Sequence, residues 1–145
     1  MVVRKMEVDD IQMVYQLSCE SFSEPWSLAS IEKEIINPVA SYFVAEKEGQ
    51  VIGFGGMWHV IDEGEIINIA VHKAYQRQGI GKVILNKLIS EARERHLVVM
   101  HLEVRASNEA ARSLYLKQGF HCIATRKAYY HEPTEDALIM ECQLS

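Results

Sequence analysis

The chain has 145 residues, 48% hydrophobic and 24% charged, which is ordinary for a soluble globular protein, and its length predicts a single domain over residues 1–145. The formal net charge of −5 argues against a general nucleic-acid binder, which would normally be basic, and is compatible with a cationic acceptor such as an amine. The chain contains neither an apolar run of roughly 18 residues nor an apolar signal-peptide core. We therefore expect a cytoplasmic protein with no membrane partner and no direct nucleic-acid partner.

Three cysteines, Cys19, Cys122 and Cys142, are odd in number and widely spaced. They form no C-x-x-C pair and share no zinc-binding spacing with the six histidines. We expect buried or half-buried thiols in a reducing compartment, and no bound metal.

Residues 2–6 predict a short strand, and two helices follow it. Asp9 or Asp10 is expected to cap a helix through about Ser21, because its carboxylate can accept a hydrogen bond from a free backbone N–H. The helical spacing predicts the buried side of this helix: Ile11, Val14, Tyr15, Leu17 and Ser18.

An aromatic elbow separates the two helices. Pro25 disfavours a continuous helix, and Ser27 provides a new N-cap ahead of the apolar series Leu28, Ile31, Ile35 and Ile36. Trp26, between them, is either a core residue or a wall of an acceptor pocket, and the sequence leaves both interpretations open.

Residues 41–47 and 51–60 predict a β-hairpin that turns at 48–50, and 65–71 adds a third antiparallel strand. Three glycines interrupt the second arm: Gly53, Gly55 and Gly56. Glycines inside a strand mark either a bulge or the close approach of another backbone.

A polar turn with two glycines joins the third strand to a helix whose apolar residues are Ile80, Ile84, Leu88 and Ala92. Glycine lets the backbone approach a ligand closely, and a helix N-terminus offers free N–H groups, so this turn suits a phosphate. A P-loop does not fit, because Gln76 and Val83 stand where glycine and Ser or Thr are needed. The dinucleotide fingerprint fails at Ile84.

The second half of the chain predicts strand, helix and two strands. Residues 97–105 alternate, with Val98, Met100, Leu102 and Val104 on one face and Val99, His101, Glu103 and Arg105 on the other. A strand on each side of the helix at Ile80 implies a parallel pair with a right-handed crossover. Ser107 or Asn108 is expected to cap the next helix, which Gly119 ends. Strands at 120–130 and 136–144 flank a loop centred on Pro133.

The predicted fold is therefore an α/β protein with a mixed sheet in the order β-α-α-β-β-β-α-β-α-β-β. This order, together with the pattern Gln/Arg-x-x-Gly-x-Gly/Ala at Gln76, Gly79 and Gly81, resembles the GNAT superfamily of N-acetyltransferases. Residues 102–108 (LEVRASN) and 114–120 (LYLKQGF), with Pro25-Trp26-Ser27 and Tyr129-Tyr130, resemble the ribosomal-protein-alanine N-acetyltransferases (RimI) within it.

This resemblance implies an enzyme that moves the acetyl group of acetyl-CoA to a protein N-terminus, the N-terminal alanine of a small-subunit ribosomal protein. It implies Glu103 as general base and Tyr115 as general acid. It also implies a set of residues around acetyl-CoA: Ile69, Ala70 and Val71 along pantetheine, Arg77, Gln78, Gly79, Ile80, Gly81 and Lys82 around the pyrophosphate, and Asn108 further along the arm. The loop from His131 to Thr134 departs from the family pattern, which bears on the choice of acceptor.

Elementary chemistry supports these roles and leaves alternatives. An α-amine with a pKa of about 7.7–8.0 is mostly protonated at neutral pH, so a carboxylate that removes its proton would make it nucleophilic. Glu103 is alternatively a sheet residue paired with Arg105 or His101, and Tyr115 a packing residue. Lys73, Arg77 and Lys82 either bind CoA phosphates or form a solvated rim.

Two other functions remain open on the sequence alone. A GNAT enzyme that acetylates a small amine or a lysine side chain would use the same glycine turn. A non-catalytic acyl-CoA-binding module would keep the turn without needing both Glu103 and Tyr115.

Overall fold

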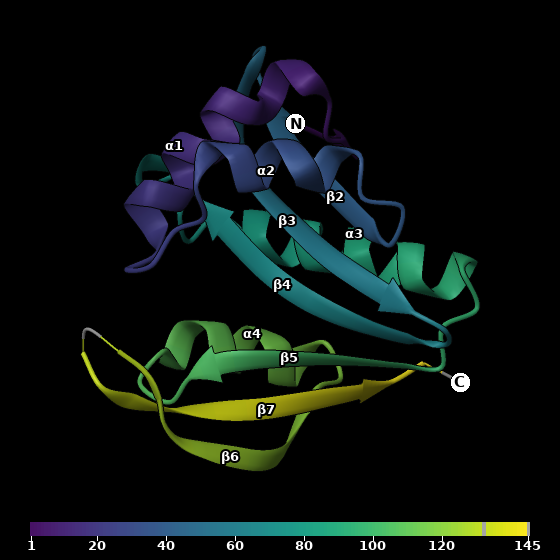
Figure 1. The fold of residues 1–145 in the computed structure, drawn as a ribbon, viewed down its shortest axis with the longest axis vertical. Coiled ribbons are helices and arrows are strands. Elements are labelled where there is room, and N and C mark those ends of the chain that lie inside the picture. Colours follow the sequence, from purple (N-terminus) through teal and green to yellow (C-terminus); the bar gives the residue numbers. More distant parts are fainter. Residues whose placement is uncertain (132, 145) are drawn as a thin grey trace.

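The computed structural model describes residues 1–131 and 133–144, and Figure 1 shows its fold. The elements follow the predicted order: β1 (Val2–Lys5), η1 (Val8–Asp10), α1 (Ile11–Ser21), α2 (Leu28–Ile35), β2 (Ala40–Lys47), β3 (Gln50–Val60), β4 (Glu63–Val71), η2 (Lys73–Tyr75), α3 (Ile80–Glu94), β5 (Val99–Arg105), α4 (Glu109–Lys117), β6 (His121–Tyr130) and β7 (Glu135–Gln143). The predicted α/β fold class is confirmed.

The strands of the described residues form one sheet in the order β1-β2-β3-β4-β5-β7-β6. Strands β1 to β4 pair antiparallel, and so do β5, β7 and β6. The predicted parallel pair across α3 is confirmed, because β4 and β5 run in the same direction. The last strand, β7, inserts between β5 and β6, a position that the order of elements along the chain does not indicate.

Helices cover both faces of the sheet. Helices α1 and α2 pack on β2, β3 and β4, whereas α3 covers the opposite face of the same strands (Figure 1). Each face has its own apolar core. One core joins α1 and α2 to the sheet through Val14, Leu17, Ile31 and Phe54, and the other joins α3 and α4 to it through Ile84, Leu88, Met100, Tyr115 and Phe120.

Two glycines of β3 stand where neighbouring elements approach the backbone. A Cβ atom at Gly56 would lie 2.2 Å from the Tyr42 ring, and one at Gly55 would lie 2.5 Å from Ile84 of α3. The pairing of β3 with β4 also shifts between Gly56 and Met57. The extra residue of this bulge is Ile67 of β4, opposite the glycines, and the groups that approach Gly55 and Gly56 are side chains. The predicted close approach of another backbone is present at Gly53, where a Cβ would lie 3.1 Å from the Ala70 carbonyl oxygen.

Helix ends agree with the sequence, with one exception. Ser27 caps α2 and Asn108 caps α4 through side-chain oxygens, and Gly119 follows α4 with a φ of +102°. Asp10 precedes α1, but its side chain makes no cap hydrogen bond to that helix. The capping role predicted for Asp10 is wrong, because its carboxylate instead accepts two hydrogen bonds from Arg4, at 2.8 and 3.0 Å, and one from the Glu7 backbone at 2.7 Å.

Replacing Asp10 with asparagine is expected to lower the free energy of unfolding at pH 7 by about 2 kcal/mol, the usual size for a hydrogen-bonded charged group. Asp10 is only 5% exposed, and its hydrogen bonds to Arg4 hold its pKa below the ordinary value. Its stabilising contribution is complete above the unfolded-state pKa of about 3.9 and is lost as pH falls through the lower folded-state pKa. Urea unfolding of the wild type and the variant measures the difference in stability at pH 7 and again near pH 3, where it should be smaller.

The matched control for this experiment is Asp9→Asn, at an exposed neighbour in the same turn. We expect Asp9→Asn to change stability by less than about 0.5 kcal/mol, the usual range for surface sites. Equal losses at the two positions, or a loss at Asp10 that persists unchanged at pH 3, would contradict the role of its carboxylate.

The cysteines differ in part from the expectation. Cys142 is buried, but Cys19 and Cys122 are exposed, so the prediction of buried or half-buried thiols is wrong for these two. Cys122 is exposed because β6 forms the edge of the sheet and has no buried residues. Within the described ranges, no helix is long and apolar enough to cross a membrane.

Candidate active site

Strands β4 and β5 separate after a short parallel contact. They pair at three positions only, from Glu63 opposite Val99 to Glu65 opposite His101. Beyond this point β4 continues beside β3, whereas β5 continues beside β7. A bulge at Ile67, which lies between the paired residues Ile66 and Asn68, bends β4 at the same place. The edge of β4 that faces β5 is therefore free of strand pairing from Ile66 onward.

An open groove of about 680 Å³ lies at this separation. Its floor comes from β4 and β5, and its walls come from the α1–α2 connection, α4 and the end of β6. The lining residues are Ser18, Ser21 to Trp26, Ile66 to Ile69, Leu102 to Arg105, Asn108, Ala111, Tyr115, Tyr129 and Tyr130.

Glu103 lies on β5 in the groove, and its side chain is 24% exposed. Its nearest cation is Arg126 of β6, with Nε 3.7 Å from the carboxylate. The adjacent Glu103 carboxylate raises the pKa of the Tyr129 phenol. The two partners that the sequence suggested for Glu103 are both engaged elsewhere, since Arg105 pairs with Glu135 and His101 with Glu141.

Tyr115 projects from α4 into the same groove and is 9% exposed. Its ring packs 5.9 Å from the Phe120 ring, so it has the packing role that the sequence left open as well as a place at the groove. Burial, with a smaller contribution from Tyr130, raises the pKa of Tyr115 to about 12. The phenol therefore stays protonated throughout the neutral range.

The glycine turn lies between β4 and the first turn of α3. Gly79 is the residue before α3 and has a φ of +81°, and Arg77 also has a left-handed φ of +64°. Turns that alternate in this way direct successive N–H groups to one side and form anion-binding concavities. The side chain of Gln76 holds the turn by donating a hydrogen bond to the Val71 carbonyl at 3.1 Å. The turn thus presents the N–H groups and the helix N-terminus that a pyrophosphate needs.

The predicted cofactor residues occupy different environments. Ile69 and Asn108 line the groove, whereas Ala70 and Ile80 are 4% exposed and contribute their side chains to the cores. Ala70 and Ile80 therefore have only their backbone groups to offer a ligand. Asn108 uses its Oδ1 to cap α4, at 3.2 Å from the Ala111 nitrogen, which leaves its amide N–H₂.

The basic side chains Arg77 and Lys82 and the neutral Gln78 are exposed at the glycine turn. Within the described part of the chain, no group of three or more His, Cys, Asp or Glu side chains is arranged to hold a metal ion.

Trp26 is partly buried against the core and also lines the groove. It packs against Trp58, with ring centres 6.1 Å apart. Trp58 in turn donates a hydrogen bond from Nε1 to Glu34 of α2 at 2.6 Å. The elbow between α1 and α2 is thus a wall of the groove that is anchored in the core.

Sequence reasoning did not single out Arg105 and Arg126 as site residues. Arg126 reaches Glu103 from β6, across the intervening strand β7, and Arg105 contacts both the α1–α2 connection and the β6–β7 connection. No local pattern indicates either contact, because the partners are far apart in the chain. In the loop from His131 to Thr134, Glu132 lies outside the described residues.

The model of the acetyltransferase (GNAT) family matches residues 11–120. The chain belongs to this family. Among relatives, a Bacillus subtilis protein provisionally named as a ribosomal protein bS18-alanine N-acetyltransferase is 40% identical to this acetyltransferase, over 95% of this chain and 92% of the relative. The ribosomal protein bS18-alanine N-acetyltransferase of Escherichia coli is 36% identical, over 99% of this chain and 97% of the relative.

The fold of this acetyltransferase is also that of a solved relative. The crystal structure of the ribosomal-protein-S18-alanine N-acetyltransferase from Escherichia coli superposes with a TM-score of 0.92, at 34% identity, and the match covers 99% of this chain and 94% of that one. The GNAT resemblance expected from the glycine turn and the order of elements is confirmed.

Proposed function

We propose that this acetyltransferase transfers the acetyl group of acetyl-CoA to the N-terminal alanine of ribosomal protein bS18. The observation that carries the chemistry is the groove where β4 and β5 separate, because Glu103, Tyr115 and the unpaired edge of β4 all border it. The acceptor is supported by the names of full-length relatives such as the enzyme of Escherichia coli. A ribosomal acceptor would place the reaction in the cytoplasm.

In this proposal, acetyl-CoA lies along the free edge of β4, with its pyrophosphate at the glycine turn. Ile69, Ala70 and Val71 offer backbone groups to the pantetheine amides. The N–H groups of residues 77 to 82 bind the pyrophosphate, with Arg77 and Lys82 adding positive charge. Asn108 offers its amide N–H₂ to the same arm. The bulge at Ile67 brings backbone N–H groups close to the thioester, where one can stabilise the oxyanion.

Glu103 accepts the proton of the α-ammonium, directly or through a water, and the freed amine attacks the thioester carbonyl. The new C–N bond forms and the C–S bond breaks. The attacking nitrogen then loses its second proton, the thiolate of CoA takes up one proton, and the proton held by Glu103 passes to solvent. Tyr115 donates its hydroxyl hydrogen bond toward that sulfur. Because its pKa of about 12 exceeds that of a thiol, near 8.5, the phenol stabilises the thiolate chiefly by hydrogen bonding. No enzyme nucleophile is required.

The acidity of the acceptor favours an N-terminus over a lysine side chain. An α-amine has a pKa of about 8 and a lysine about 10.4, so freeing the lysine at the same pH costs about 3 kcal/mol more. The half-buried carboxylate of Glu103 meets the smaller cost more readily.

Mass spectrometry of peptides incubated with the protein and acetyl-CoA tests this function. We expect the N-terminal peptide of bS18 from the same organism to be acetylated on its alanine, faster than the same peptide begun with Met or Ser. A version with a blocked N-terminus and an internal lysine should not react. Acetylation confined to lysine side chains or to small amines such as spermidine would overturn the proposed acceptor. Binding of acetyl-CoA with no release of CoA to any amine would indicate a non-catalytic module.

A further inference from the structure

Arg105, at the end of β5, makes hydrogen bonds to two connections that are remote from each other in the chain. Its Nη2 donates to Ser23 Oγ in the α1–α2 connection at 2.9 Å and to the His131 carbonyl at 3.1 Å. Its Nη1 donates to the Pro133 carbonyl at 3.1 Å and to Glu135 Oε1 at 3.3 Å. The guanidinium also lies over the Tyr130 ring, 4.4 Å from its centre.

These contacts join two rims of the groove that otherwise belong to different parts of the fold. Ser23 lies on the rim formed by the α1–α2 connection, and Tyr130 lies on the rim formed by the end of β6. Helices α1 and α2 pack mainly on β2, β3 and β4, whereas β6 packs on β7. The guanidinium of Arg105 therefore supplies a direct link between the two rims, and its partner Ser23 lies 82 positions away in the chain.

The link extends to the cofactor side through Glu135. One carboxylate oxygen of Glu135 accepts from Arg105, and the other accepts from the Ser107 backbone N–H at 3.3 Å. Ser107 precedes Asn108, which caps α4 and lines the groove. The hydrogen-bonded series Ser23–Arg105–Glu135–Ser107 thus leads from the rim formed by the α1–α2 connection to the start of α4.

The pattern of acceptors requires a guanidinium rather than any cation. A simple ion pair with Glu135 would need one charge, and lysine would provide it. Two backbone carbonyls, a hydroxyl and a carboxylate around one planar group need the forked donors of arginine, and the aromatic ring needs its flat face. At 24% exposure, the Arg105 side chain is partly shielded from competing water.

We propose that Arg105 is a positioning residue that holds the two rims of the acceptor groove together and thereby sets the affinity for the acceptor peptide. Both of its Nη atoms already donate to protein acceptors, so we expect it to act on peptide binding more than on the chemical step. This inference rests on the proposed function, because it assigns the groove to a peptide acceptor.

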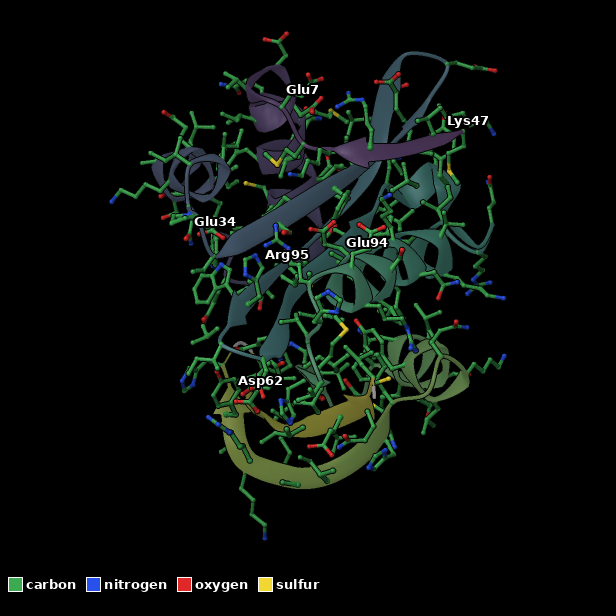
Figure 2. The ribbon with its side chains drawn as sticks, turned by 90° about the vertical axis from the view of Figure 1, so that its right-hand side faces the viewer. Glu7, Glu34, Lys47, Asp62, Glu94 and Arg95 are labelled. Carbon is green, nitrogen blue, oxygen red and sulfur yellow. The ribbon has the colours of Figure 1, made fainter. Side chains whose placement is uncertain are left out.

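The test compares Arg105→Lys and Ser23→Ala with the wild-type protein. Arg105→Lys keeps the charge and loses the fork, and is expected to raise KM for the bS18 peptide at least about 10-fold. Ser23→Ala removes one contact on an exposed loop, and should raise the KM for the bS18 peptide about threefold. In both variants kcat should stay within about threefold, and the dissociation constant of acetyl-CoA, measured by calorimetry, within about twofold. Arg95→Lys, at an exposed arginine paired with Glu91 at the end of α3, is the matched control and should change none of these values (Figure 2).

Hydrogen–deuterium exchange of the free protein provides a readout that needs no acceptor. Amides of residues 22–27 should exchange faster in Arg105→Lys than in the wild type. In Arg95→Lys their exchange rates should equal those of the wild type. If the KM for the peptide is unchanged in Arg105→Lys, the inference is wrong. It is also wrong if the KM for acetyl-CoA rises by the same factor as the KM for the peptide. If the wild type acetylates no N-terminal peptide, the proposed function is wrong. If exchange at residues 22–27 is the same in Arg105→Lys as in the wild type, Arg105 does not hold the two rims together.

Discussion

Replacing Glu103 with glutamine is expected to lower kcat/KM for an alanine-initiated peptide about 100-fold at pH 7, the low end for loss of a general base. The amide keeps the shape of the side chain but cannot take a proton from the α-ammonium. As pH rises through about 8, the amine loses its proton to solvent, and the deficit of the variant should narrow. Rates measured from pH 6.5 to 9.5 at saturating acetyl-CoA would show a pH profile displaced upward.

Glu94→Gln is the matched control, because Glu94 is exposed at the end of α3 (Figure 2). The 15 residues of α3 separate it from the glycine turn by about 22 Å. This control should keep both the rate and the pH profile of the wild type. A deficit in Glu103→Gln that is the same at every pH would assign Glu103 to orientation of the acceptor and not to proton transfer.

Substituting valine for Gly79 is expected to weaken acetyl-CoA binding about 100-fold, or about 2.7 kcal/mol. Gly79 has a φ of +81°, in which a β-branched residue is a genuine outlier, so the turn would rearrange. A rearranged turn no longer directs the N–H groups of residues 77 to 82 to one side, where the pyrophosphate would lie. Calorimetric titration of acetyl-CoA into the purified variant measures the loss.

Gly49→Val separates the effect on binding from the effect on backbone strain. Gly49, in the β2–β3 turn, has a φ of +79°, and a Cβ at either glycine would meet no atom within 4 Å. Both variants should therefore lose about 1–2 kcal/mol of stability in thermal unfolding. Only Gly79→Val should lose acetyl-CoA affinity. Equal affinities for acetyl-CoA in the two variants would contradict the assignment of the pyrophosphate to the glycine turn.

The candidate site was predictable where its signals are local. The glycine turn can be read from Gln76, Gly79 and Gly81, because a turn before a helix needs particular residues at fixed spacing. The alternation of β5 places Glu103 on the face opposite Leu102, and the family resemblance suggests its role as a base. The surroundings of Glu103 were not predictable, since Arg126 approaches from β6 and neither suggested partner, Arg105 or His101, pairs with it.

By itself, the sequence determined the order of helices and strands, the cap at Ser27, a second cap at Ser107 or Asn108, and the turn at Gly119. Each of these depends on residues within one or two turns of the chain, where side-chain spacing and backbone conformation decide the outcome. It also carried the GNAT resemblance, because those local signals occur in the order of that family.

Only the tertiary structure decided where β4 and β5 separate, that β7 inserts between β5 and β6, and that Arg105 joins the two rims of the groove. These features come from pairings between segments tens of residues apart, such as Arg105 with Ser23 and β5 with β7. A long-range contact is selected by the packing of the whole sheet and leaves no periodic pattern in either partner. The glycine turn can therefore be recognised from the sequence, whereas the groove beside it exists only once the sheet has formed.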